Sequence, residues 1–278
     1  MNKDIVYPNW INTAEKLYKE ENLPYYKIAE IVGANRKTVS YYLRLKGYKS
    51  NPKYVREIDP EKLCKYKNKN RDIFEKIDNE EKAYWLGFLY ADGNVSDNIN
   101  SIELSLKEED YNHIVKFKNF LGAENKIRKK IKNMNGKQYI AYGIGISDAK
   151  IKNDLINLGC CPRKTKIITF PTKNQVPDEF IRHFVRGYFD GDGCISHGST
   201  SKVTAEILGT EEFLTGYINW TGLHKNKINS FKHSNIRRVI YSGPYAMIIL
   251  NKMYKNSSIY LDRKYELYKK FATLFGDE

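Results

Sequence analysis

Two nine-residue segments constrain the fold of this chain more than any other feature. Residues 85–93 read WLGFLYADG and residues 185–193 read VRGYFDGDG, so the second begins 185 − 85 = 100 positions after the first. Each is an apolar, helix-like run with glycine at its third position. Each ends in a small residue, an aspartate and a glycine. A pattern that returns in this way predicts two related helices in one chain.

The small residues of these segments predict how the two helices meet. Gly87 and Ala91 are four residues apart, as are Gly187 and Gly191, and this spacing places each pair on one face of its helix. Because such residues have little or no side chain, another backbone can approach closely there. The obvious partner for each helix is the other copy.

Side-by-side packing of the two helices would bring Asp92 and Asp192 together at their C-terminal ends. The helix dipole is negative at that end and the two carboxylates repel each other, so a cation is needed to offset the charge. A hard divalent metal with oxygen ligands is the natural candidate. The alternative is two unrelated buried helices whose Asp-Gly pairs are ordinary C-terminal turns.

The repeat extends well beyond the two segments. Lys164 follows Asp92 by 164 − 92 = 72 positions, Lys264 follows Asp192 by 264 − 192 = 72 positions, and an arginine precedes each lysine. Residues 104–109 and 207–212 also correspond, and a helix-like stretch follows each of them. Residues 80–175 and 176–278 therefore read as two copies of one unit, arranged as a pseudo-dimer within a single chain.

The two segments resemble the LAGLIDADG motif of the homing endonucleases, in the single-chain, two-motif class. The resemblance runs from about residue 80 to the C-terminus and implies an α+β fold. In that fold two pseudo-symmetric αββαββα units each carry an antiparallel DNA-binding sheet. The implied activity is hydrolysis of both strands of a long, asymmetric DNA site by a monomer, leaving 3′ overhangs.

The resemblance also assigns roles to individual residues. The eighth motif residue is the metal-binding catalytic acid of the family, which here means Asp92 and Asp192, with the backbone carbonyls of Ala91 and Gly191 as further ligands. The implied metal is Mg²⁺, for which Mn²⁺ would substitute. The basic residue that the family places near the scissile phosphate falls on Lys164 and Lys264.

The motifs depart from the family pattern at two positions. Tyr90 stands at the sixth position of the first motif, where the family has aspartate, whereas the second motif keeps Asp190. Because the sixth residue is not a metal ligand in the family, the change leaves the implied metal site intact. Arg186, at the second position of the second motif, predicts that part of this helix meets solvent or another domain.

The net charge of the chain limits the kinds of molecule that it is expected to bind. The formal net charge is +14 over 278 residues, which predicts an anionic partner. Nucleic acid is favoured over a membrane surface, since the chain has no long apolar run and no signal-peptide-like N-terminus, and an intracellular location is expected. The rival function is a non-catalytic nucleic-acid binder, an intron maturase or a transcriptional regulator. Both motif aspartates are present, which favours the enzyme.

Residues 1–50 predict a separate all-helical domain of the helix-turn-helix type. Apolar spacing predicts helices over 10–21, 25–32 and 36–45, with a glycine-containing turn before the third. The basic residues gather on that third helix, so we expect it to contact DNA; a purely structural three-helix domain is the alternative. The residues expected to face the major groove are Arg36, Lys37, Ser40, Tyr41 and Arg44.

Residues 51–79 are predicted to be a basic linker. Lys67, Lys69 and Arg71 alternate with one tyrosine and two asparagines in residues 65–71, which suits a segment that follows phosphates. A solvated tether is an equally good interpretation.

Alternating segments predict the two sheets. Strands are expected over 101–107, 127–132 and 139–146 in the first unit, and over 203–208, 227–232 and 237–241 in the second. A basic, half-exposed antiparallel sheet is suited to lie in a major groove. The residues expected to contact bases or phosphates there are Ser101, Glu103, Lys107, Arg128, Lys130, Lys132, Thr204, Glu206, Lys232, Arg237 and Arg238.

Overall fold

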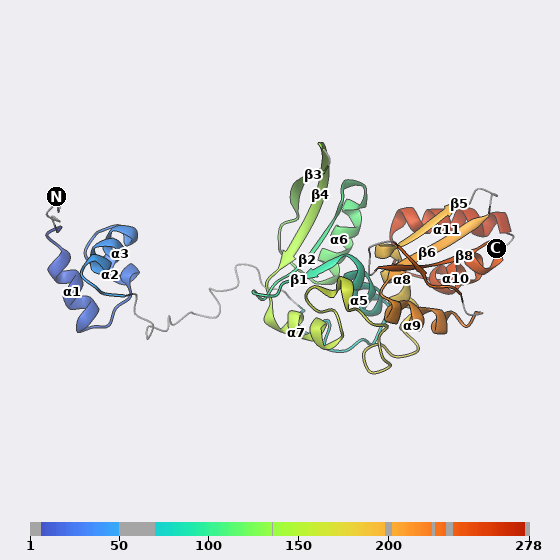
Figure 1. The fold of residues 1–278 in the computed structure, drawn as a ribbon, viewed down its shortest axis with the longest axis horizontal. Helices are drawn as coiled ribbons and strands as arrows, with labels where there is room; N and C mark the ends of the chain where they lie inside the picture. The colour runs from blue at the N-terminus through green and yellow to red at the C-terminus, as the bar shows by residue number, and fades with distance from the viewer. Residues whose placement is uncertain are drawn as a thin grey trace. The chain divides into compact units, whose positions relative to one another are not determined.

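The computed structural model describes residues 7–49, 70–134, 136–197, 202–223, 226–231 and 236–275. These residues form two separate units, a small one at the N-terminus and a large one that holds the rest (Figure 1). Three of the predicted DNA contacts, Lys67, Lys69 and Lys232, lie outside the described residues, as does the side chain of Lys132.

The small unit contains the three predicted helices, α1 (Ile11–Lys19), α2 (Tyr25–Ile31) and α3 (Arg36–Leu45). Their apolar faces share one core, in which Ala14, Ile28, Val39 and Leu43 are fully buried. The side chain of Asn35 caps α3 by accepting a hydrogen bond from the backbone N–H of Lys37 at 2.9 Å. This core leaves the basic side of α3 facing outward.

The first half of the large unit has the predicted αββαββα order. Its elements are α5 (Glu80–Asp92), β1 (Gly93–Val95), β2 (Ile102–Lys107), the 3₁₀ turn η1 (Glu108–Asp110), α6 (Tyr111–Phe120), β3 (Arg128–Met134), β4 (Lys137–Ile146), α7 (Ala149–Asn157) and the 3₁₀ turn η2 (Lys164–Lys166).

The second half repeats this order and adds a terminal helix. Its elements are α8 (Ile181–Asp192), β5 (Gly193–His197), β6 (Val203–Gly209), α9 (Glu211–Thr221), β7 (Asn229–Ser230), β8 (Arg237–Ser242), α10 (Pro244–Tyr254) and α11 (Asp262–Phe275). The α+β fold of two pseudo-symmetric units is therefore confirmed.

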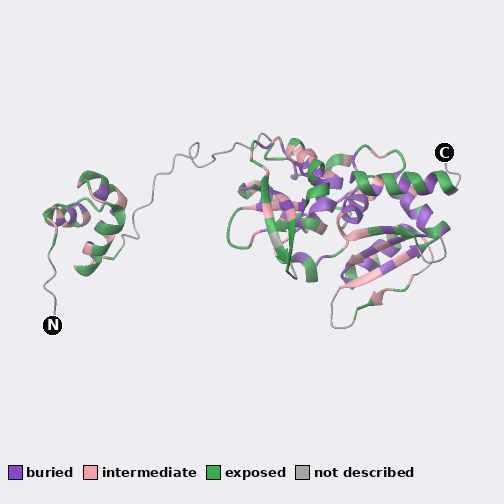
Figure 2. Cartoon of the chain, turned by 90° about the horizontal axis from the view of Figure 1, so that it is seen from above, coloured by how far each residue is buried: buried purple, intermediate pink, exposed green. Residues whose placement is uncertain are grey.

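Each half contributes one antiparallel, four-stranded sheet. The strand orders are β1-β2-β4-β3 and β5-β6-β8-β7, so the two sheets have the same topology. Leu104 and Leu106 point into the core while Glu103 and Lys107 point away, as the alternation of a half-buried strand requires. Figure 2 shows the result as strands that carry buried, intermediate and exposed residues in succession.

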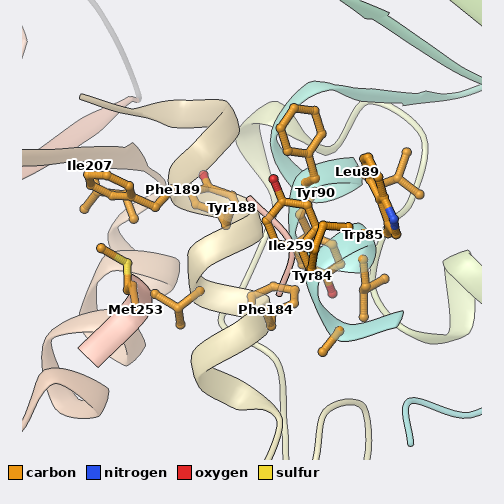
Figure 3. Close-up of a cluster of buried hydrophobic side chains, with 14 of the residues drawn as sticks. Tyr84, Trp85, Leu89, Tyr90, Phe184, Tyr188, Phe189, Ile207, Met253 and Ile259 are labelled. Carbon is orange, nitrogen blue, oxygen red and sulfur yellow. The ribbon is translucent and has the colours of Figure 1, made fainter. Parts of the chain in front are cut away.

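The two motif helices pack directly against each other and join the halves. A Cβ added to Gly87 would stand 2.0 Å from the carbonyl oxygen of Phe184, and one added to Gly187 would stand 1.9 Å from that of Tyr84. Figure 3 shows α5 and α8 side by side, with aromatic residues such as Tyr84, Phe184 and Tyr188 packed around their contact. The two distances are nearly equal, as the pseudo-symmetry of the repeat requires. They confirm the prediction that the motif glycines allow the two backbones to approach closely.

The end of the predicted linker belongs to the large unit. Ile73, Phe74 and Ile77 are buried in the core of that unit, and the Phe74 ring lies 5.7 Å from that of Phe120. Residues 51–79 are thus too long a range for the linker, because its last residues carry an apolar cluster.

None of the helices in the described part of the chain combines the length and the apolar character that a membrane span needs.

Candidate metal centre and nucleic-acid interface

The two motif aspartates lie at the junction of the two halves. Asp92 and Asp192 are the last residues of α5 and α8, and a strand begins at the next residue of each chain segment. Gly93 is extended, with φ −71°, and a Cβ there would stand 2.6 Å from the carbonyl oxygen of Leu89. The glycine is thus required by close packing and not by a left-handed turn. An ordinary Asp-Gly helix end does not describe the motif.

The two helix ends touch. A Cβ on Gly191 would stand 2.3 Å from the Cβ of Ala91 and 3.4 Å from a carboxylate oxygen of Asp92. The Asp92 carboxylate of the first half therefore lies against the last turn of the second motif helix. This confirms that the helix packing brings the two acidic ends together.

The carboxylates are held in an unfavourable environment. Burial raises the pKa of Asp192 to about 6, and the charge of Asp92 adds to the shift. The pKa of Asp92 is also raised by burial of its carboxyl, although the residue as a whole is exposed. Each carboxylate also sits at the negative end of its own helix. A pair of acids in this setting attracts a cation.

Two buried lysines supply part of the positive charge. The Nζ of Lys264 donates to the carbonyls of Phe189 and Asp190, at 2.7 and 2.8 Å, and to that of Gly193. Lys164 donates in the same way to Gly93. Burial lowers the pKa of Lys264 to about 8. The lysines therefore neutralise the C-terminal ends of the motif helices, a role that their matching offsets in the sequence did not reveal.

The donor set suits a hard cation with a partly retained water shell. The described residues contain no group of three or more His, Cys, Asp or Glu side chains placed to hold a metal. The available donors are two carboxylates and carbonyls of the last helical turns, where an α-helix leaves four carbonyls without helical partners. Lys264 donates to the carbonyls of Phe189, Asp190 and Gly193, so these three oxygens are already engaged. A site that offers few protein oxygens leaves coordination positions for water, and Mg²⁺ prefers to keep several waters when it binds a protein.

Of the two alternatives predicted for the part of α8 around Arg186, solvent is wrong, whereas contact with the other repeat unit is found. Arg186 is fully buried, because its guanidinium donates to Glu80 at 2.7 Å and to the carbonyls of Ile259 and Met253 at 2.8 Å. Glu80 lies in the first turn of α5, so this ion pair crosses between the two halves. The sequence did carry a signal for this ion pair. It consists of a charged residue within one apolar motif helix and an acidic residue at the start of the other.

Asp190 forms a second buried polar cluster that sequence reasoning missed. Its carboxylate accepts hydrogen bonds from the hydroxyls of Tyr84 and Tyr254, at 2.7 and 2.5 Å, and from the backbone N–H of Leu261 at 2.8 Å. The Tyr84 hydroxyl also lies 3.0 Å from Nε2 of His113. Tyr84 lies 106 positions from Asp190 and Tyr254 lies 64 positions from it, so the sequence around Asp190 gives no local signal of this cluster.

The first sheet presents the predicted contacts on the face away from the core. Register pairs Glu103 with Gly145 and Lys107 with Ala141, and pairs Arg128 with Gly143 and Lys130 with Ala141. All four side chains therefore share one face. Lys130 is bonded to Glu103, so a ligand must compete for it. Ser101 lies immediately before β2.

The second sheet separates two arginines that were predicted to act together. Thr204, Glu206 and Arg238 share the outer face, and Arg238 approaches Glu206 to 3.5 Å. Arg237 pairs with Gly209 on the other face, where it lies 4.0 Å from Glu211. Adjacent strand residues point to opposite faces, so Arg237 does not join the outer set.

The remaining predicted contacts divide between the two units. On α3, a shallow depression is lined by Arg36, Lys37, Ser40, Tyr41 and Arg44, so the structure gathers this set on one surface. Arg71, in contrast, is bonded to Asp148 at 2.7 Å and ties the start of the large unit to the N-cap of α7.

Comparison with known proteins gives similarities of structure. No protein-family model and no curated protein sequence matches the chain. The chain resembles LAGLIDADG homing endonucleases in structure. I-WcaI bound to its DNA recognition sequence has a TM-score of 0.49 and 13% identity, over 71% of this chain and 91% of that one. The LAGLIDADG meganuclease I-AabMI bound to uncleaved DNA has a TM-score of 0.44 and 12% identity, over 71% and 90%. Full-length DUF199/WhiA from Thermatoga maritima has a TM-score of 0.44 and 15% identity, over 74% and 64%.

Proposed function

We propose that the chain is a metal-dependent, site-specific endonuclease that cuts both strands of double-stranded DNA. The observation that carries this proposal is the pair of carboxylates, Asp92 and Asp192, at abutting helix ends, each with a lysine donating to the carbonyls of its own helix end. Two quasi-equivalent acidic sites in one chain suit two strands of opposite polarity, because the pseudo-twofold axis that relates the sites also relates the strands.

Mg²⁺ is the proposed cofactor, with Mn²⁺ as a substitute. Asp92 and Asp192 would bind it, together with the carbonyls of Ala91 and Gly191. Such an ion supplies an activated water and stabilises the leaving 3′ oxygen. Lys164 and Lys264 would hold positive charge beside the scissile phosphates. They do so from fixed positions, because their ammonium groups are anchored on backbone carbonyls.

Double-stranded DNA is the proposed partner. The net charge of +14 supports an anionic ligand, and both sheets present one open face with charged and polar side chains. The first of these faces carries Lys107, Arg128 and Lys130, whereas the second carries Thr204, Glu206 and Arg238. Faces of unlike chemistry read unlike half-sites, so we propose a long asymmetric target. The cut would leave 3′ overhangs, and a monomer would suffice because one chain holds both acidic sites.

Replacement of Asp92 by asparagine tests the assignment. The variant keeps the shape of the site and removes one metal-binding charge, so it should lose cleavage of one strand while DNA binding stays within about threefold of wild type. The measurement is strand-resolved cleavage of an end-labelled duplex in Mg²⁺. Cutting of both strands at the wild-type rate would show that Asp92 is not a catalytic ligand.

A further inference from the structure

The sixth residue of each motif contacts the segment that carries the lysine of the same half. In the second half this residue is Asp190, which is fully buried on α8. Its Oδ2 accepts a hydrogen bond from the backbone N–H of Leu261 at 2.8 Å. The carbonyl of Leu261 in turn accepts the first helical bonds of α11, from Lys264 and Tyr265. Asp190 therefore holds the residue from which α11 begins.

The same loop closes back on the motif helix. Lys264 lies in the first turn of α11, and its Nζ donates to the backbone carbonyls of Phe189 and Asp190. Asp190 is thus bonded twice to one short segment, through its side chain to Leu261 and through its carbonyl to Lys264. A second tie comes from Tyr254, the last residue of α10, whose hydroxyl donates to Oδ1 at 2.5 Å. The connection between α10 and α11 is fixed at both ends.

The first half reaches the same result with different chemistry. The hydroxyl of Tyr90 donates to the carbonyl of Leu158 at the end of α7. A Cβ added to the next residue, Gly159, would stand 2.1 Å from that hydroxyl, so the chain turns tightly around Tyr90. Cys160 then lies with its Sγ 3.5 Å from the carbonyl of Leu89. From this docked turn the chain reaches Lys164, which donates to Gly93.

We propose that the sixth motif residue, Tyr90 in the first half and Asp190 in the second, is a positioning residue that docks the lysine-bearing segment on its own motif helix. Tyr90 does so by donating to a helix C-terminus, and Asp190 does so by accepting from the backbone before a helix. The tyrosine in the first motif is therefore a functional counterpart of the aspartate in the second. Each residue acts on one lysine only.

Amine labelling of the metal-free full chain tests this docking without any cleavage. A water-soluble acetylating reagent is applied and each lysine is quantified by peptide mass spectrometry. In wild type, Lys264 and Lys164 should be protected, because they are 3% and 8% exposed. Asp190→Ala should raise labelling of Lys264 about tenfold and leave Lys164 unchanged, whereas Tyr90→Phe should do the reverse.

Two further variants separate docking from general loosening. Asp190→Asn should keep most of the protection, since its oxygen still accepts from Leu261 and its amide can donate to Tyr254. Tyr217→Phe should leave both lysines protected, because the Tyr217 hydroxyl is buried without a hydrogen-bond partner among the described residues and is remote in sequence from both lysine segments. Equal deprotection of both lysines in Tyr90→Phe, or unchanged protection of Lys264 in Asp190→Ala, would overturn the proposal.

The consequence for catalysis rests on the proposed function. Lys264→Met and Lys164→Met each identify the strand whose cutting depends on that lysine. Asp190→Ala should slow the strand that Lys264→Met slows, and Tyr90→Phe should slow the other, by about tenfold each. Equal slowing of both strands would contradict selective positioning. Failure of the wild type to cut any duplex would refute the endonuclease instead, and the labelling result would still decide the docking.

Discussion

At the residue scale, the buried charges of Arg186 and Asp190 each have specific partners, whereas the two motif carboxylates lie in a less favourable setting. Arg186 has Glu80 and two backbone carbonyls, and Asp190 has two tyrosine hydroxyls and a backbone N–H. Asp92 lies against the last turn of α8, which Asp192 ends, and the pKa values of both carboxyls are raised. Residues that cost stability where they stand are typical of sites selected for function.

Asp192→Asn should therefore stabilise the metal-free protein. The pKa of the Asp192 carboxyl in the folded protein is raised to about 6 from an ordinary value of 3.8. Above pH 6 this carboxylate is therefore charged in the folded protein, where the charge costs more free energy than in the unfolded chain. Removing that charge should raise the free energy of unfolding at pH 7.5 by about 2 kcal/mol. Urea denaturation in EDTA measures it, with the surface change Asp178→Asn as the control. A less stable Asp192→Asn protein would contradict the electrostatic account of the site.

His113 should make stability depend on pH in the opposite direction. Burial lowers its pKa to about 3, so between pH 6.5 and 3 the unfolded chain binds a proton that the folded chain does not. Stability from this residue is complete above pH 6.5 and falls with pH, by about 2 kcal/mol at pH 5. Between pH 7.5 and pH 5, the free energy of unfolding should fall less for His113→Gln than for wild type. The carboxylates contribute equally to the fall in both proteins, so the difference reports on His113. Equal drops would mean that His113 is protonated in the fold.

At the element scale, local pattern predicted most of the helices and strands, whereas contacts distant in sequence decided what they do. Helix α3 and strands β2, β4 and β6 lie where periodicity placed them. The sequence also predicted the helix pair from its small residues. It did not predict that Arg186 is buried, that Arg237 lies on the inner face, or that the lysines cap helix ends. Each of these depends on a partner from a distant segment, and neither spacing nor propensity encodes such a partner.

The helix pair should not tolerate a side chain at its crossing. A Cβ on Gly187 would stand 1.9 Å from the backbone oxygen of Tyr84, and backbone cannot move aside as a flexible side chain can. Gly187→Ala should lower the free energy of unfolding by about 3 kcal/mol or more. Gly145→Ala is the matched control, since its Cβ would meet nothing nearer than 4.0 Å. Similar melting temperatures for the two variants would refute the close contact.

At the scale of the whole molecule, the chain joins a small basic helical unit to a large unit with two acidic sites. The basic side of α3 holds Arg36, Lys37 and Arg44 on one depression, which suits DNA phosphates. The contribution of the small unit to DNA binding is measured in the full chain.

Replacement of Arg36, Lys37 and Arg44 by alanine should weaken DNA binding in a salt-dependent way. Each lost phosphate contact reduces the slope of log K against log salt by roughly 1. Fluorescence anisotropy from 50 to 300 mM KCl measures the slope, in roughly the range where the effect is large. Lys16→Ala on α1, where Lys16 pairs with Glu20, is the control. An unchanged slope in the triple variant would assign the small unit a structural role.

Strand-resolved cleavage of a selected duplex tests whether Asp92 and Asp192 support metal-dependent cutting of DNA. A duplex that the full chain selects from a random pool is end-labelled on each strand and incubated with Mg²⁺, with EDTA as the control. We expect staggered cuts on both strands with 3′ overhangs, which are lost when Asp92 and Asp192 are both replaced by asparagine. A tightly bound duplex that stays intact in Mg²⁺ and in Mn²⁺ would refute the nuclease activity and make the protein a DNA binder.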